Sequence, residues 1–449
     1  MRQLIDFPYK HVLVLGLAKS GEAAAKLLHH SGVQVRVNDQ KPYEENPQAR
    51  TLGDLGIDVI TGSHPMSVLD GIDYVVKNPG IPYTNPIVDE AMRRELPVVT
   101  EVELAYRLNG DNMIGITGSN GKTTTTTLVY EMLKANDKGT KLAGNIGEVA
   151  CEVAQTTSEK ETMVVELSSF QLIGTETFKP HIAVFLNLYE AHLDYHKTME
   201  HYAWSKSQLF AHQQANDFLV YNADQEIVRE LVASANSQRV PFSLENKQPL
   251  GIWCDEEFLY YQDECVIALK DIMLAGKHNL ENIMAAVGAA KLSGVTNKGI
   301  QQVLRTFSGV EHRMQFVKEV QGRNFYNDSK ATNMLATKNA LEAFEQPTIL
   351  LAGGLDRGNA LDDLGPYLKN VKAMILFGET APKFKQLAIE NGIETYDVVD
   401  NVKQAAEKAY RISEAGDVIL LSPACASWDQ YRTFEERGDM FMDAVHTLK

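Results

Sequence analysis

Residues 113–124 read Met113-Ile-Gly-Ile-Thr-Gly-Ser-Asn-Gly-Lys-Thr-Thr124, and no other stretch predicts as much of the fold. The apolar run at 113–116 predicts a buried strand, the glycine-rich run at 117–121 a loop, and the apolar spacing at 128–133 a helix. A phosphate-binding P-loop requires strand, glycine loop and helix in this order, because backbone N–H groups and the helix N-terminus then face the phosphate oxygens.

The residues of this loop have predicted tasks. Lys122 would reach the β- and γ-phosphates of ATP, and the Thr123 hydroxyl would bind Mg²⁺. The general pattern has a glycine five residues before Gly121, where this chain has Ile116, with Gly118 inside the loop instead. We expect phosphate binding despite this departure; the alternative is an ordinary glycine turn. The expected ATP contacts of the loop are Gly118, Ser119, Asn120, Gly121, Lys122, Thr123 and Thr124.

A second glycine turn, Gly16-Leu-Ala-Lys-Ser-Gly21, lies between a predicted strand at 11–15 and a predicted helix at 22–30. The next predicted strand, 33–38, ends at Asp39, near the spacing of about 20 residues in dinucleotide-binding βαβ units. Ala18 replaces the middle glycine and would crowd a pyrophosphate. The stretch therefore predicts a Rossmann-like fold, with NAD binding as the less favoured alternative.

Composition sets the broad class. A length of 449 residues predicts about three domains of about 150 residues each. The net charge of −16 argues against general binding to nucleic acid or anionic membranes. No apolar run approaches the ~18–20 residues of a membrane span, and the N-terminus lacks a signal-peptide pattern, so we expect a cytoplasmic protein. The 4 cysteines form no C-x-x-C pair, which favours free thiols over zinc or redox motifs.

The central region offers candidate metal ligands. A predicted strand at 162–166 ends at Glu166, and a carboxylate at that end beside the P-loop strand is well placed for Mg²⁺; the alternative is a solvated strand end. His192, Asp194 and His196 alternate along the chain and raise the alternative of zinc. The absence of a nearby cysteine and of an H-E-x-x-H pattern makes zinc the less favoured reading.

Two asparagines follow in the predicted helix at 277–286. Asn279 and Asn282 are three residues apart and share one helix face. Their amides could read the edge of an adenine base. The alternative for Asn279 is an N-cap of the helix.

The C-terminal third repeats the strand-into-loop pattern. Predicted strands at 324–327, 348–352 and 417–422 lead into loops rich in glycine, serine and charge, and such loops meet at one edge of an open α/β sheet. A cysteine nucleophile at Cys425 is an alternative that P-loop chemistry does not need.

These motifs in this order resemble the Mur ligase family, specifically its D-glutamate-adding branch. The resemblance covers residues 117–123, 144–147, 166–172, 187–194, 206, 278–282, 312–313, 328–333 and 422–438, the last segment being typical of that branch. It implies an ATP-dependent ligase that joins D-glutamate to UDP-N-acetylmuramoyl-L-alanine through an acyl phosphate, in peptidoglycan synthesis. One rival is a folylpolyglutamate synthetase-like ligase, against which the N-terminal unit and residues 422–438 count. The other is a P-loop ATPase or switch protein that ligates nothing.

The resemblance also implies roles for residues that the local sequence leaves unassigned. His192 would lie near a second Mg²⁺ and the substrates, and Lys206, otherwise an ordinary solvated lysine, would be carbamylated (N6-carboxylated) to help hold Mg²⁺. Lys122, His192 and Lys206 would be catalytic, with Thr123, Glu166, His192 and Lys206 around the metal ions. Further ATP contacts would be Asn279, Asn282, Arg313 and Asp328; UDP-substrate contacts Lys19, Ser20, Asp39, Gly80 and Asn145; and D-glutamate contacts Lys330, Thr332, Arg357, Ser427 and Phe434. For Arg357 the alternative is a solvent-exposed loop tip.

The expected architecture is an α/β chain of three domains. Residues 1–100 would form a Rossmann-like UDP-substrate domain, 101–309 a central P-loop ATPase domain with a parallel sheet, and 310–449 a Rossmann-like amino-acid-binding domain. We expect a monomer acting on small-molecule substrates, without nucleic acid or membrane partners.

Overall fold

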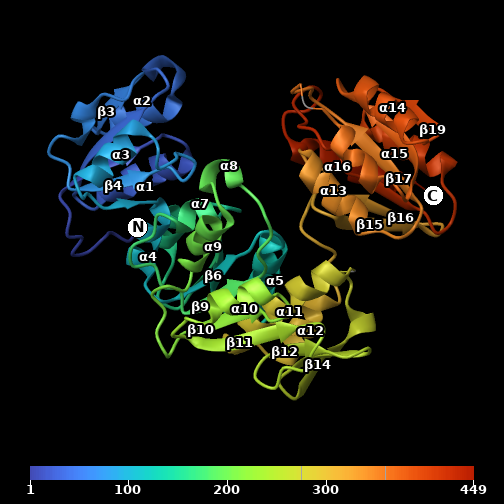
Figure 1. Ribbon diagram of the computed structural model, residues 1–449, viewed down its shortest axis with the longest axis horizontal. Coiled ribbons are helices and arrows are strands. Elements are labelled where there is room, and N and C mark those ends of the chain that lie inside the picture. Colours follow the sequence, from blue (N-terminus) through green and yellow to red (C-terminus); the bar gives the residue numbers. More distant parts are fainter. Residues whose placement is uncertain (275, 359, 449) are drawn as a thin grey trace. The chain divides into compact units, whose positions relative to one another are not determined.

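The computed structural model describes residues 1–274, 276–358 and 360–448. The chain divides into two compact units, one ending at Thr306 and one beginning at Phe307 (Figure 1). In the described residues the first unit contains two sheets and the second unit one, each covered by helices, so the predicted α/β class is confirmed. Within the described part of the chain, none of the helices has the length and apolar character needed to cross a bilayer.

The first sheet is parallel, with strands in the order β3–β2–β1–β4–β5. The strand order reverses between β1 and β4, and the crevice at the carboxyl ends of two such strands is where open α/β sheets bind ligands. The strands predicted at 11–15 and 33–38 are present as β1 and β2. The elements of this region are β1 (His11–Leu15), α1 (Lys19–His30), β2 (Gln34–Asp39), α2 (Pro47–Asp54), β3 (Asp58–Thr61), β4 (Tyr74–Lys77), α3 (Pro86–Arg93) and β5 (Val98–Val99).

The second sheet has the order β14–β13–β12–β11–β10–β9–β6–β8–β7, parallel up to β12 and antiparallel in the hairpins at the β14 edge. Short apolar runs alternating with acidic turns at 251–269 predict those edge hairpins, whereas β11 was missed because it opens on polar residues and contains Pro241. The strands are β6 (Met113–Thr117), β7 (Thr140–Gly144), β8 (Thr162–Glu166), β9 (Ile182–Phe185), β10 (Phe218–Asn222), β11 (Gln238–Ser243), β12 (Ile252–Cys254), β13 (Phe258–Tyr261) and β14 (Glu264–Ala268).

Helices cover this sheet and include the expected P-loop helix. Strand β6 is buried along its whole length between β8 and β9, and α5 begins at Lys122 directly after the loop. Helices α5 and α11 pack against one another (Figure 1). The helices are α4 (Glu101–Asn109), α5 (Lys122–Lys134), α6 (Ala150–Thr156), α7 (Ser169–Leu172), α8 (Leu193–His196), α9 (Met199–Ser207), α10 (Glu226–Val232), α11 (Lys277–Leu292) and α12 (Asn297–Leu304).

One helix boundary differs from the expectation. Residues 202–206 by themselves predict the opening of a helix, but the structure has this helix, α9, from Met199 to Ser207. The side chain of Thr198 accepts a hydrogen bond from the His201 N–H at 3.1 Å and so caps the helix earlier. Lys206 consequently lies in the last turn of the helix and not near its start.

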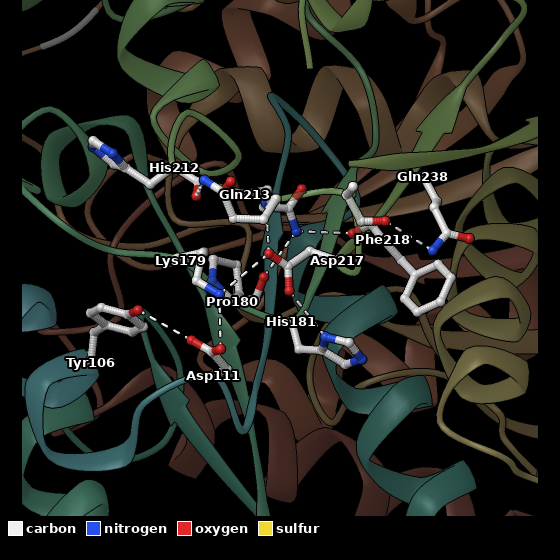
Figure 2. A network of polar contacts seen from close by, with 12 residues as sticks. Tyr106, Asp111, Lys179, Pro180, His181, His212, Gln213, Asp217, Phe218 and Gln238 are labelled. Atoms are coloured by element: carbon white, nitrogen blue, oxygen red, sulfur yellow. Dashed lines mark hydrogen bonds and ion pairs between the residues drawn. The ribbon is translucent and has the colours of Figure 1, made fainter. Parts of the chain in front are cut away.

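A polar network joins the starts of several strands of the second sheet (Figure 2). The buried carboxylate of Asp217 lies 3.1 Å from His181 Nδ1 and 3.4 Å from Lys179 Nζ. Lys179 Nζ also pairs with Asp111 at 2.8 Å, and the Tyr106 hydroxyl donates to Asp111. The network fixes the amino ends of β6, β9 and β10, and leaves their carboxyl ends to the P-loop side.

The second unit has one sheet in the order β15–β16–β20–β17–β18–β19. Strands β16, β20, β17, β18 and β19 run parallel, and β15 is antiparallel to β16. The two edge strands were missed because they are short or carry alternating polar residues. The elements are β15 (Gln315–Val320), β16 (Arg323–Asn327), α13 (Met334–Glu342), β17 (Thr348–Gly353), β18 (Val371–Phe377), α14 (Ala381–Glu390), β19 (Thr395–Val398), α15 (Val402–Ile412), β20 (Val418–Leu421) and α16 (Phe434–Thr447).

Candidate active site

Hydrogen bonds within the P-loop and to a neighbouring segment fix its conformation. Lys122 Nζ donates to the carbonyls of Gly118 and Ser119, both at 2.9 Å, so its ammonium group lies against the loop. The Ser119 hydroxyl donates to Tyr189 O at 3.0 Å, and the Asn120 N–H donates to Asn187 Oδ1 at 2.9 Å. The segment at 187–189 therefore anchors the loop from the side of β9. Thr123 is buried and Thr124 is half-buried in the first turn of α5.

The unusual glycine position has a steric cause. A Cβ at Gly118 would lie 2.8 Å from the Leu186 Cβ, at the end of β9. Ile116 meanwhile lies inside β6 and is fully buried. The glycine is needed where the loop crosses β9, and the strand position is filled by a core residue.

Glu166 ends β8 beside the loop, and its side chain is only 1% exposed. Its Oε1 accepts a hydrogen bond from Asn145 Nδ2 at 2.9 Å, while its Oε2 is buried without a hydrogen-bond partner among the described residues. The alternative of a solvated strand end is therefore wrong. A buried carboxylate oxygen without a donor fits a cation ligand. Asn145, predicted as a UDP-substrate contact, is placed next to this carboxylate.

Lys206 is also buried, with 1% of its side chain exposed, so the alternative of a solvated surface lysine is wrong. Its Nζ donates to Gly118 O at 2.8 Å and lies 3.4 Å from Thr117 Oγ1. Burial, reinforced by the positive charge of Lys122, holds the pKa of Lys206 well below its usual value. Both effects disfavour the charged ammonium form relative to that of an exposed lysine.

His192 is exposed and precedes α8 in a left-handed backbone conformation, with φ at 57°. Such strained conformations are frequent at functional sites. Its ring lies 5.0 Å from that of Phe170. His196 points elsewhere: its Nε2 is 2.9 Å from Ser169 Oγ and its Nδ1 3.4 Å from Ser205 Oγ. The zinc alternative thus finds no support in His196, and the Asp194 side chain lies outside the described residues.

The two asparagines lie on the first turns of α11. The N-cap residue of α11 is Gly276, so the N-cap alternative for Asn279 is wrong. Asn282 Nδ2 lies 3.5 Å from Asn279 Oδ1. A Cβ at Gly121 would lie 2.0 Å from Asn282 Oδ1, which means that the asparagine touches the end of the P-loop.

The predicted UDP-substrate residues of the first sheet gather after β1, β2 and β4. Asp39 accepts hydrogen bonds from the N–H groups of Leu17 at 2.6 Å and Lys41 at 2.8 Å. Asn78 donates to Ser20 Oγ at 2.9 Å and accepts from the Gly80 N–H at 3.1 Å. Lys19 is exposed at the start of α1. These residues, other than Asn145, lie at the point where the strand order reverses.

In the second unit Asp328 is a buried carboxylate. It accepts hydrogen bonds from Ser422 Oγ at 2.8 Å and from the Met314 N–H at 3.2 Å. Burial raises the pKa of Asp328 to about 7. Arg313, in the same loop as Met314, is exposed. Asp328 therefore fastens the segment that carries Arg313 to the ends of β16 and β20.

The predicted amino-acid residues lie after neighbouring strands. Lys330 Nζ is 5.7 Å from the centre of the Phe434 ring, and Thr332 is half-buried in the same loop after β16. Ser427 is buried in the loop after β20. Arg357 is exposed after β17, as its alternative required, but its guanidinium carbon lies over the Trp428 ring, 4.9 Å from the ring centre. Strands β16, β20 and β17 are adjacent, so these loops meet at one edge of the sheet.

Sequence reasoning missed the residue that ties these loops together. Arg437 is fully buried, and its guanidinium donates to Ser329 Oγ, to the carbonyls of Ser329 and Cys425, and to the Gly353 carbonyl at 3.4 Å. Burial lowers the pKa of Arg437 to about 10. The only signal was an arginine inside the 422–438 segment. Cys425 itself is buried with a raised thiol pKa, against the nucleophile alternative, and the 4 cysteines are free thiols.

Comparison with known proteins matches three parts of the chain. Residues 10–100 match a Mur ligase MurD-like N-terminal domain, 116–290 a Mur ligase middle domain, and 312–425 a Mur ligase glutamate ligase domain. A UDP-N-acetylmuramoylalanine--D-glutamate ligase of Geobacillus sp. (strain WCH70) is 59% identical over 451 residues, covering 100% of both chains. The protein of the same name from Bacillus subtilis (strain 168) is 54% identical over 442 residues and 98% of both chains.

The chain belongs to the Mur ligase family. Among solved structures, this Mur ligase is similar in fold to a UDP-N-acetylmuramate-alanine ligase of Thermotoga maritima, with a TM-score of 0.58, 17% identity and coverage of 98% of this chain and 99% of that one. It is also similar to the MurF ligase of Thermotoga maritima solved in complex with ADP, with a TM-score of 0.57, 16% identity and coverage of 99% and 98%. The family predicted from the motifs is confirmed.

Proposed function

We propose that this Mur ligase joins the amine of D-glutamate to the carboxylate of UDP-N-acetylmuramoyl-L-alanine at the expense of ATP, a step of peptidoglycan precursor synthesis in the cytoplasm. The observation that carries the proposal is the group of buried Glu166, buried Lys206 and Lys122 around one P-loop. The relatives that match 98% and 100% of the chain, at 54% and 59% identity, bear the name of this activity. We further propose that the enzyme acts as a monomer.

At the ATP end, loop residues 118–124 would surround the phosphates with N–H groups, and Lys122 would exchange its loop carbonyls for phosphate oxygens. Asn279 and Asn282 lie on the α11 face that touches the loop, which suits contacts to the base. Arg313 and Asp328 are proposed as contributions of the second unit to ATP binding. Positioning and charge neutralisation are the main requirements of phosphoryl transfer.

Two Mg²⁺ ions are proposed, and the residues present fit them. The unpartnered Oε2 of Glu166 and the buried Thr123 hydroxyl offer oxygen ligands for one ion, and His192 with a modified Lys206 would serve the other. Bound Mg²⁺ would supply positive charge against the phosphate oxygens as charge develops in transfer.

The modification of Lys206 has a physical basis in its environment. A neutral amine can attack carbon dioxide, forming an N–C bond and releasing one proton, which leaves an N-carboxylate on the side chain. Burial lowers the pKa of Lys206, which makes the neutral amine needed for this reaction easier to form than at an exposed lysine. We propose that Lys206 carries this carbamate in the active enzyme.

The acceptor and the amino acid are assigned to opposite ends of the chain. Lys19, Ser20, Asp39, Gly80 and Asn145 are proposed to bind the UDP-linked substrate, and the first four support this by gathering at the strand-order reversal. For D-glutamate the proposal names Lys330, Thr332, Arg357 and Ser427 as polar contacts and Phe434 as an apolar wall.

The proposed reaction has two steps, phosphoryl transfer and amide formation. The γ-phosphoryl group of ATP passes to a carboxylate oxygen of the acceptor, which gives an acyl phosphate and ADP. The amine of D-glutamate attacks the carbonyl carbon, phosphate leaves with the former carboxylate oxygen, and the nitrogen loses a proton. The enzyme's contribution is to hold the reactants in line and to neutralise phosphate charge.

A coupled phosphate-release assay tests the proposal. Phosphate release should require ATP, UDP-N-acetylmuramoyl-L-alanine and D-glutamate together, with D-glutamate strongly preferred over L-glutamate, L-lysine and meso-diaminopimelate. Rapid ATP hydrolysis without the other substrates would instead support a plain ATPase. A preference for L-lysine or diaminopimelate would leave the ligase chemistry intact and overturn the assignment of the amino acid.

A further inference from the structure

Lys77 is a buried lysine that the mechanism above does not use. It ends β4, its side chain is 1% exposed, and Nζ donates to the main-chain carbonyls of Pro79 at 3.3 Å and Ile81 at 3.0 Å. Among the described residues, the salt bridges of the first unit include none to Lys77, and burial lowers its pKa to about 7. Burying an amine without a carboxylate partner lowers the stability of the fold, which indicates that the amine has a function at this position.

The same two carbonyls are shared with a residue of the second sheet's domain. The Tyr195 hydroxyl, on α8, lies 3.5 Å from Lys77 Nζ, 3.5 Å from Pro79 O and 3.3 Å from Ile81 O. The Lys77 ammonium also lies 4.8 Å from the centre of the Tyr83 ring. An amine from one domain and a phenol from the next thus grip a single loop, residues 78–82.

This loop is connected on both sides to proposed substrate contacts. At one end Asn78 bonds to Ser20 and to the Gly80 N–H, both of which belong to the proposed nucleotide site. On the other side, the loop contacts Tyr195. The Phe170 ring lies 4.7 Å from the Tyr195 ring and 5.0 Å from the His192 ring. A continuous set of contacts therefore leads from the nucleotide loop to His192.

We propose that Lys77 and Tyr195 form a latch that fixes loop 78–82 against α8 and so positions His192 when the UDP-linked substrate is bound. The inference rests on the proposed function and deepens it. Both are positioning residues, because neither is placed against the reacting atoms. Through the latch, binding of the nucleotide part of the substrate would help to position His192. Binding energy from groups that do not react can organise the reacting centre in this way.

Two variants test the latch in the full-length enzyme by initial-rate kinetics. Lys77→Met keeps an unbranched, slightly shorter side chain without the amine, and Tyr195→Phe keeps the ring without its hydroxyl. Each variant should raise the KM for UDP-N-acetylmuramoyl-L-alanine and lower kcat. In Lys77→Met each of these two changes should be roughly tenfold, while the KM for ATP changes less than about twofold. The double variant should be little worse than Lys77→Met alone, because both act on the same carbonyls.

Tyr83→Phe is the matched control. It removes the bond from the Tyr83 hydroxyl to the Ile173 carbonyl at 3.3 Å, which joins the same two domains, but keeps the ring beside Lys77. Its kinetics should stay near those of the wild type. Wild-type kinetics in Tyr195→Phe, or an equal rise of all three KM values with a lower Tm, would overturn the latch. If the wild-type enzyme itself fails to ligate D-glutamate, the proposed function fails first, so the two failures are distinguishable.

Discussion

The guanidinium carbon of Arg357 lies 4.9 Å from the centre of the Trp428 indole ring. The two side chains come from the loops that follow β17 and β20, which are neighbours in the sheet of the second unit. Trp428 is 64% exposed, so its ring is accessible to the Arg357 guanidinium. A cation–π contact restricts the positions that the guanidinium can take, which suits a fork-like contact between its N–H groups and a carboxylate.

Arg357→Ala should raise the KM for D-glutamate roughly ten- to a hundredfold, since losing a charge-assisted contact costs about 1.5–3 kcal/mol. The KM for ATP should change little. Arg357→Lys, which keeps the charge without the fork, should fall between the two. Initial-rate kinetics with D-glutamate as the varied substrate make the measurement. An unchanged KM in Arg357→Ala would show that Arg357 is a solvent-exposed loop residue that does not bind D-glutamate.

Trp428→Ala should raise the same KM by a smaller factor, about two- to fivefold, because an exposed cation–π contact contributes ~0.5–1 kcal/mol. Trp428→Phe retains an aromatic face and should lie closer to the wild type. Saturation with D-glutamate should also alter indole fluorescence in the wild type. Absence of that signal, with unchanged kinetics in Trp428→Ala, would show that the stack does not prepare Arg357.

Lys122→Ala should lower kcat by ~10³-fold or more, the scale of losing a principal charge stabiliser in the transition state. Lys134→Ala provides the control, because Lys134 is an exposed lysine at the other end of the same helix, α5. Single-turnover measurements separate the phosphoryl step from product release. Near-normal turnover in Lys122→Ala would remove the P-loop from the proposed chemistry.

Lys206 should show a branched extension on its Nζ in a high-resolution electron density map of the Mg²⁺-loaded enzyme. Activity should also fall in buffers depleted of carbon dioxide and recover when bicarbonate is added, since the carbamate forms reversibly. A bare ammonium group in a crystal of fully active enzyme would contradict the modification.

Glu101 predicts a pH dependence of stability in the first unit. Burial raises its pKa to about 7, and Glu101 Oε2 accepts a hydrogen bond from the Cys151 N–H at 3.0 Å. A raised carboxyl pKa means that the folded state binds the proton more tightly than the unfolded state, so the stabilisation is complete below about pH 4.5 and is lost as the pH rises through about 7.

Chemical denaturation between pH 5 and about 8 measures the effect. The free energy of unfolding should fall more steeply with rising pH in the wild type than in Glu101→Gln, which has no proton to lose. Glu159→Gln, at an exposed carboxylate of the same unit, should keep the wild-type slope. Parallel slopes in Glu101→Gln and the wild type would assign the dependence to other groups.

Local patterns predicted the parts of this protein that local forces determine. The P-loop could be placed from residues 113–124 because strand, turn and helix each follow from neighbouring residues. Edge strands such as β15 and β19 were missed because pairing, rather than an apolar pattern, defines them.

The burial of single charges could not be predicted. Lys206 is buried because residues about ninety positions earlier fold over it, and Arg437 because three strand-end loops close around it. Nothing in the residues next to either one distinguishes it from a solvated surface side chain. The lysine was assigned a role only through the family, and the arginine was missed.

The contact between Gly121 and Asn282 has a consequence for drug resistance. A side chain at position 121 would collide with the Asn282 amide, so the phosphate loop and the proposed base pocket share a wall. Resistance to an inhibitor of the nucleotide site could arise by replacing Asn282 with a larger or differently shaped residue. Such a side chain would displace the loop that carries Lys122. Escape mutations there should therefore carry a fitness cost, and compounds that reach this wall should select for resistance slowly.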